Sequence, residues 1–260
     1  MPLPRALSKA VVGAYVRAYD VDLDEAEPLN GAGAYPTFDA FFTRPLRRGA
    51  RSWHDAAGAL GSPADGHLVA TGTVDDDCIE VKGRPYRAAD LLLSADVLAR
   101  HRGSSFAVIY LSPRDYHRVH APADCSLVEV RSRQGDLFPV NSISERHIPD
   151  YLVINRRVAI DLDSAEHGFM TLVMVAAMIV GRITVVGVEG RDVPFGRQRF
   201  DPAIQLRRGE ELATFHLGST AVIFGDPAGP CFDRPLGPIQ VGNRLTRAEG
   251  GGARRQVGDG

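Results

Sequence analysis

The first fifty residues follow a helical spacing of apolar positions. A helix over residues 6–19 would gather four side chains along one face: Leu7, Val11, Tyr15 and Ala18. A second helix is predicted to begin near Thr37, because a threonine cap there precedes Asp39 and a phenylalanine-rich face. The pattern therefore predicts an N-terminal helical arm over residues 1–50.

From about Gly61 the pattern changes to short alternating or β-branched runs, separated by glycine, proline and aspartate. Strands are predicted over residues 68–74, 78–81, 106–111, 126–131 and 157–161, with longer strands over 168–176 and 182–188. Residues 88–98 favour a helix. These elements predict an α+β protein with a mostly antiparallel β core, residues 51–248. The tail, 249–260, is rich in glycine and is predicted to be disordered.

Composition limits the class of protein. A chain of 260 residues with 44% hydrophobic side chains can bury a substantial core. The formal net charge of −2 provides no basic field for phosphates, so no nucleic-acid partner is expected. Cys78, Cys125 and Cys231 are odd in number and widely separated. That pattern favours a reducing compartment over a disulfide framework and predicts no metal site.

Nothing at the start of the chain has the pattern of a signal peptide. The longest apolar run, residues 172–180, is about half of what a membrane span needs. The chain is therefore not expected to cross a membrane. The helix over residues 6–19 fits two interpretations, a helix lying on a membrane surface or one packed on its own domain.

Three short motifs carry candidate chemistry: Ser62-Pro63-Ala64-Asp65-Gly66, Asp115-Tyr116-His117-Arg118-Val119-His120 and Leu217-Gly218-Ser219-Thr220. Ser219 can attack the preceding Gly218 carbonyl if a histidine removes its hydroxyl proton, and an aspartate can hold that histidine. Each motif also has a structural explanation. Gly-Ser-Thr and Asp65 suit turns, and two histidines three residues apart are either structural or a metal pair on a helix.

Longer blocks favour the chemical interpretation, because the chain resembles the phosphatidylserine decarboxylases in the order of several motifs. The blocks are Thr37 to Leu46, Ser62 to Gly66, Tyr110 to Pro122, Gly135 to Ser142, Arg208 to Leu212 and Phe215 to Thr220. The resemblance covers roughly residues 35 to 225. It implies a pyruvoyl-dependent decarboxylase of a membrane lipid.

The resemblance also implies roles for matching residues. Ser219 would attack the Gly218 carbonyl, and an ester, β-elimination and hydrolysis would leave a pyruvoyl group on a new chain, 219–260. His120 would act as base, with Asp65 fixing its tautomer. His117 matches the histidine that serves decarboxylation. The family's pyruvoyl group forms a Schiff base with the substrate amine and accepts the electrons left by carbon dioxide.

The resemblance implies further partners and a location. The substrate would be phosphatidylserine and the product phosphatidylethanolamine, at the cytoplasmic face of the cell membrane, with peripheral attachment. The chains 1–218 and 219–260 would stay associated, and a homodimer of processed protomers remains open. The remaining alternatives are a pyruvoyl enzyme for a soluble amino acid, an uncleaved serine hydrolase and a non-catalytic β-rich binding protein. The hydrolase would normally carry a Gly-x-Ser-x-Gly elbow, which Ser219-Thr220-Ala221 lacks.

Two positions depart from the family pattern. Val175-Ala176-Ala177 stands where relatives carry Val-Gly-Ala, and Asn155-Arg156-Arg157-Val158 stands where they carry Asn-Glu-Arg-Val. The first adds a methyl group where a backbone can approach closely. The second replaces an acid with a base. Both bear on local packing or on the substrate site.

Overall fold

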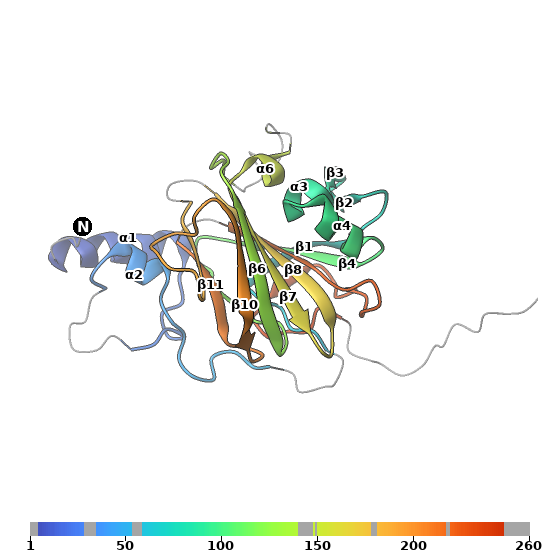
Figure 1. Ribbon diagram of the computed structural model, residues 1–260. Helices are drawn as coiled ribbons and strands as arrows, with labels where there is room; N and C mark the ends of the chain where they lie inside the picture. Colours follow the sequence, from blue (N-terminus) through green and yellow to red (C-terminus); the bar gives the residue numbers. More distant parts are fainter. Residues whose placement is uncertain are drawn as a thin grey trace, which may run out of the picture.

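The computed structural model describes residues 5–28, 35–53, 59–139, 148, 150–177, 181–216 and 219–246. The predicted tail, 249–260, lies outside them. The two expected helices are confirmed as α1 (Arg5–Tyr19) and α2 (Phe38–Phe42), and Thr37 caps α2 by accepting a hydrogen bond from Ala40 N at 3.0 Å. Both helices lie to the left of the strands in Figure 1.

An eight-stranded antiparallel sheet forms the centre of the molecule, which confirms the α+β prediction. Its strands follow the spatial order β10-β6-β7-β8-β12-β4-β1-β13. Their bounds are β1 (Gly66–Thr73), β4 (Ser105–Leu111), β6 (Cys125–Arg133), β7 (Arg157–Ser164), β8 (Gly168–Ala176), β10 (Gly196–Leu206), β12 (Ser219–Phe224) and β13 (Gly237–Ile239).

Smaller elements cover both faces of this sheet. On one face lies a three-stranded sheet made of β5 (Arg118–His120), β11 (Glu211–Phe215) and β9 (Ile183–Val185). On the other face lie α3 (Ala88–Leu92), α4 (Ala95–His101), α6 (Tyr151–Ile154) and a hairpin of β2 (Cys78–Val81) and β3 (Arg84–Arg87). Figure 1 shows α3, α4 and the hairpin on the side of the sheet away from α1.

The central strands are buried on both faces. In β12, Ala221 and Ile223 join the core beneath the three-stranded sheet, whereas Val222 and Phe224 join the core beneath the helices. Because successive side chains of a strand point to opposite faces, two covered faces require apolar residues at every position. This explains the continuous apolar run of β8, where each residue from Phe169 to Ala176 is buried.

Three predictions about elements need correction. The helix expected over 88–98 is two helices, because Leu93 adopts a left-handed φ of 57° and Ser94 caps the second helix. The segment 182–188 contributes only the short strand β9. Ser219 belongs to a Gly-Ser-Thr motif that also suits a turn, but it is the first residue of β12, because its backbone pairs with Leu111 and Ala176.

The arm packs through its own aromatic cluster. Val12, Phe41 and Phe42 are buried there, and Tyr15 packs against them while its hydroxyl donates to the Pro113 carbonyl at 3.1 Å. Tyr15 therefore turns toward the domain, whereas Leu7 and Val11 of the predicted apolar face are exposed. No helix among the described ranges is both long and apolar enough to cross a membrane.

Candidate active site

The four predicted site residues come from segments that meet at the end of β4. Leu111, the last residue of β4, pairs with Ser219 of β12 on one side, and the neighbouring Tyr110 pairs with His67 of β1 on the other. Asp65 immediately precedes β1, so its backbone lies about 10 Å from that of Ser219, two strand spacings away. The loop after Leu111 carries His117 and leads to His120 in β5.

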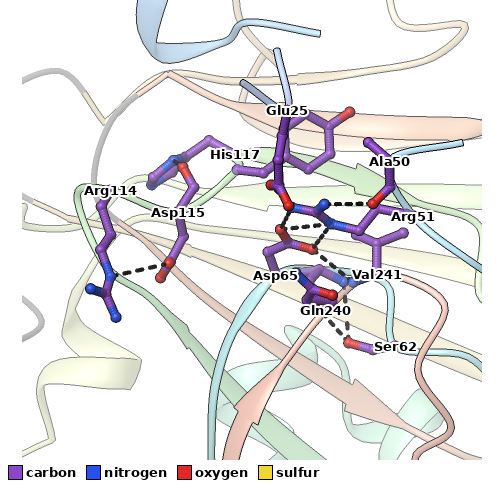
Figure 2. Close-up of polar contacts among 12 residues, drawn as sticks. Glu25, Ala50, Arg51, Ser62, Asp65, Arg114, Asp115, His117, Gln240 and Val241 are labelled. Atoms are coloured by element: carbon purple, nitrogen blue, oxygen red, sulfur yellow. Dashed lines mark hydrogen bonds and ion pairs between the residues drawn. The ribbon is translucent and has the colours of Figure 1, made fainter. Parts of the chain in front are cut away.

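Asp65 is a buried carboxylate, 5% exposed, with charged and backbone partners. Arg51 Nε lies 3.0 Å from both carboxylate oxygens, and Arg51 Nη2 also donates to Oδ2. The backbone N–H of Val241 donates to Oδ1 at 2.7 Å. Figure 2 shows the Arg51 guanidinium between Asp65 and Glu25.

His120 has a different pair of hydrogen-bond partners from those expected. Its Nδ1 donates to the Gly209 carbonyl at 2.8 Å, and its Nε2 lies 2.9 Å from the Tyr116 hydroxyl. The hydrogen bond expected from Asp65 is replaced by these contacts, because Arg51 and Val241 engage both Asp65 oxygens. Burial lowers the pKa of His120 below its ordinary value, against the opposing effect of the Gly209 carbonyl.

His117 is fully buried at the end of the same loop. Its Nδ1 donates to the Asp115 carbonyl at 2.8 Å, and its ring lies against Phe42 of the arm, with centroids 4.0 Å apart. Its Nε2 is buried and has no hydrogen-bond partner among the described residues. Burial lowers the pKa of His117 to about 3, so the ring is neutral at physiological pH with a free electron pair on Nε2.

The residues just before Leu217 are held from several directions. Phe215 N donates to the His117 carbonyl at 2.9 Å. His216 Nδ1 lies 2.7 Å from Asp39 Oδ1 of α2, and Arg182 Nη2 donates to Asp39 Oδ2 at 2.6 Å. Leu217, Gly218 and the Ser219 side chain lie outside the description. The chain is thus fixed shortly before the predicted cleavage site, and β12 fixes it again directly afterwards.

A cavity of about 310 Å³ opens beside Asp65 and Tyr116. Its lining combines the arm, the loop after β4 and the segment around β13, and includes Arg44, Arg51, Asp65, Arg114 and Tyr116. Acidic residues of the arm, Asp20, Asp22 and Glu25, complete one side. The cavity is therefore polar and carries both signs of charge.

Comparison with known proteins decides the family. The family model described as phosphatidylserine decarboxylase matches residues 38–245, most of the chain. The chain belongs to the phosphatidylserine decarboxylase family. It is 40% identical over 256 residues to a phosphatidylserine decarboxylase proenzyme of Bordetella pertussis, covering 92% of this chain and 84% of that protein. The proenzyme of Pseudomonas aeruginosa is 39% identical over 245 residues, with coverages of 89% and 84%.

The two departures from the pattern of phosphatidylserine decarboxylases have defined surroundings. Ala176 is 1% exposed, pairs with Ser219 and accepts a hydrogen bond from Asn155 Nδ2 at 2.9 Å. Arg156 is 7% exposed and donates to Asp192 Oδ2 at 2.6 Å and to the Gly181 and Val193 carbonyls at 2.9 Å. Arg156 therefore anchors the segments on both sides of β9 through hydrogen bonds.

Several contributors to this decarboxylase-family site were not foreseen from the sequence. Tyr116 lies inside a recognised motif, but only the fold places its hydroxyl on His120. Arg51 and Glu25 lie 14 and 40 residues before Asp65 and belong to no chemical motif. Among the residues that the structure covers, no group of three or more histidine, cysteine, aspartate or glutamate side chains could hold a metal ion.

Proposed function

We propose that the chain is a proenzyme that cleaves itself between Gly218 and Ser219 and then decarboxylates phosphatidylserine to phosphatidylethanolamine. One observation carries the proposal. Ser219 begins β12 beside the last residue of β4, and the loop that follows β4 brings His117 and His120 to the same end of the sheet. This arrangement supports the assignment of Ser219 as nucleophile, His120 as base and His117 as the second histidine.

In the proposed self-cleavage, His120 and Asp65 have different roles. In the neutral ring of His120, Nδ1 carries the proton that it donates to the Gly209 carbonyl, so Nε2 is the basic nitrogen. It would receive the Ser219 hydroxyl proton as the hydroxyl attacks the Gly218 carbonyl. Asp65, ionised between Arg51 and Val241, supplies the negative charge that favours the resulting imidazolium.

The described residues suit a pyruvoyl group at position 219. Such a group supplies a ketone that condenses with the substrate amine and accepts the electrons released with carbon dioxide. His117 offers a buried Nε2 that has no partner among the described residues, which suits a group that orients the substrate or delivers a proton to the product. Phe42 packs on this ring and excludes water from that side.

The sheet supports continued association of the two products. Cleavage would give a β chain, 1–218, and an α chain, 219–260. Both chains would contribute to the catalytic domain that follows the N-terminal arm. β12 belongs to the α chain, yet six of its residues pair with β4 and six pair with β8, both of the β chain. The α chain therefore stays in the sheet after the peptide bond is broken.

The arm supports peripheral attachment at the cytoplasmic face of a membrane. Leu7 is 48% exposed and Val11 40%, one turn apart on α1, and Ala14 and Ala18 continue the exposed stripe. The opposite side of α1 packs on Phe41 and Phe42, and Phe42 contacts His117. A helix lying in the interface would thus bring the site near its lipid substrate.

Two substitutions test the proposed reaction. Ser219→Ala should abolish both chain cleavage and decarboxylation, because it removes the nucleophile and the precursor of the ketone. His117→Ala should leave cleavage intact and lower phosphatidylethanolamine formation by about 100-fold or more. The measurements are denaturing gel electrophoresis and turnover of phosphatidylserine in mixed vesicles.

Arg102→Gln is the matched control, because the pair that Arg102 makes with Asp77 is exposed and remote from the site. It should match wild type in both assays. Normal lipid turnover by uncleaved Ser219→Ala protein would end the proposal. Cleavage with turnover of free serine and none of the lipid would reassign the substrate to a soluble amino acid.

A further inference from the structure

Arg51 makes an extensive set of hydrogen bonds beside Asp65. Its side chain is 8% exposed, and every guanidinium nitrogen has a partner. Nε and Nη2 both bond the Asp65 carboxylate, Nη2 also contacts Glu25 Oε2 at 2.7 Å, and Nη1 donates to the Ala50 carbonyl at 2.8 Å. Figure 2 shows this fork reaching Asp65 from the arm side.

Asp65 depends on Arg51 for its charge balance and its orientation. Its side chain is only 7% exposed, and a buried carboxylate is costly without a cation and hydrogen bonds. Its remaining described contact is with the Val241 N–H. Both ring nitrogens of His120 bond elsewhere, so His120 does not hold Asp65 in place.

We propose that Arg51 is the positioning residue for Asp65 in self-cleavage and that Glu25 of the arm is its second support. The inference rests on the proposed function, since it concerns the same cleavage. A planar guanidinium offers two parallel N–H groups that match a carboxylate, whereas the point charge of a lysine does not fix the carboxylate plane. This fork therefore sets the plane of the Asp65 carboxylate.

Glu25 extends the assembly into the arm. Its carboxylate bonds Arg51, and its backbone carbonyl accepts from Arg47 N at 2.9 Å. The neighbouring Ala26 carbonyl accepts from Arg47 Nε at 2.9 Å. The segment around Glu25 is therefore hydrogen-bonded to Arg47, four residues before Arg51. Through Glu25 the arm helps to position Arg51 and hence Asp65.

Chemical rescue tests this role. Arg51→Gly should slow conversion of the full-length chain by about 100-fold, the usual effect of a misplaced catalytic group, measured by pulse-chase in cell-free synthesis. Added guanidinium or methylguanidinium, at concentrations far below those that unfold proteins, should restore much of the rate. Ammonium should not restore it, and guanidinium should not rescue Asp65→Asn.

Milder variants keep the test decisive if Arg51→Gly fails to fold. Arg51→Lys keeps the charge but loses the fork and should cleave about tenfold slower, and Glu25→Gln should be slowed several-fold. Arg102→Gly is the matched control and should cleave at the wild-type rate. Wild-type rates for folded Arg51→Gly, or for both Arg51→Lys and Glu25→Gln, would overturn the inference while leaving the proposed function intact. An uncleaved wild-type chain would overturn both.

Discussion

At the scale of residues, the hydrogen bonds of His120 fix its tautomer. A carbonyl oxygen can only accept, so the contact with Gly209 places the proton on Nδ1. Nε2 then accepts from the Tyr116 hydroxyl, which therefore lies at the nitrogen that would take the serine proton in the proposed self-cleavage. Burial also lowers the pKa of His120 below its ordinary value, which favours the neutral ring.

Tyr116→Phe should move the acid limb of the self-cleavage rate to lower pH. The Tyr116 hydroxyl can donate to the neutral Nε2 and can accept from the Nε2–H of the imidazolium, and the bond to the charged ring is the stronger of the two. Loss of the hydroxyl therefore disfavours the protonated form and should lower the pKa of His120 by about half to one pH unit. Cleavage rates measured across the acid range would show this, with Tyr19→Phe on the exposed end of α1 as control. An unmoved acid limb would contradict a role for the bond between Tyr116 and His120.

The sequence allowed the candidate residues to be named, and the fold supplied their contacts. Asp65, His117, His120 and Ser219 stand in recognisable motifs, and their roles remain predictions. The Arg51 fork on Asp65 was not predictable, because no periodicity relates a residue directly after the arm to a carboxylate before β1. The prediction of a contact between Asp65 and His120 was wrong for the same reason. The residues that bond Asp65 instead, Arg51 and Val241, lie outside its motif.

At the scale of elements, a continuous apolar run predicted strand bounds well, whereas an exposed strand without such a run was missed. β8 was predicted over the correct residues, because burial on both faces makes its apolar run continuous. β10 was missed, because it is a largely exposed edge strand whose register shifts between Arg199 and Ile204, around Asp201-Pro202. Edge strands need no apolar alternation, so hydrophobicity does not mark them.

The exposed stripe of α1 predicts membrane binding by the arm. Leu7→Glu with Val11→Glu should weaken binding to vesicles containing phosphatidylserine at least about tenfold, since two apolar side chains would no longer enter the interface. Cosedimentation with such vesicles measures this. Leu236→Glu, at a position 60% exposed outside the arm, is the matched control and should bind like wild type. If the double variant binds vesicles as well as wild type does, α1 serves only to pack on its own domain.

At the scale of the whole molecule, the fold would keep the core intact after the proposed cleavage. The segment after Ser219 provides β12 in the middle of the eight-stranded sheet and β13 at its edge. Hydrogen bonds and burial on both sides of β12 do not depend on the Gly218–Ser219 peptide bond. A cleaved protein should therefore behave as one particle until it is denatured.

The intact mass of the purified protein under denaturing conditions, with and without a reductant that traps carbonyl groups, tests the central claim most directly. We predict two chains of roughly 24 and 4.5 kDa, in proportion to 218 and 42 residues of the 28.1 kDa total. The smaller chain should have a blocked N-terminus that gains mass on reduction. A single chain near 28.1 kDa from a preparation that decarboxylates phosphatidylserine would contradict the account.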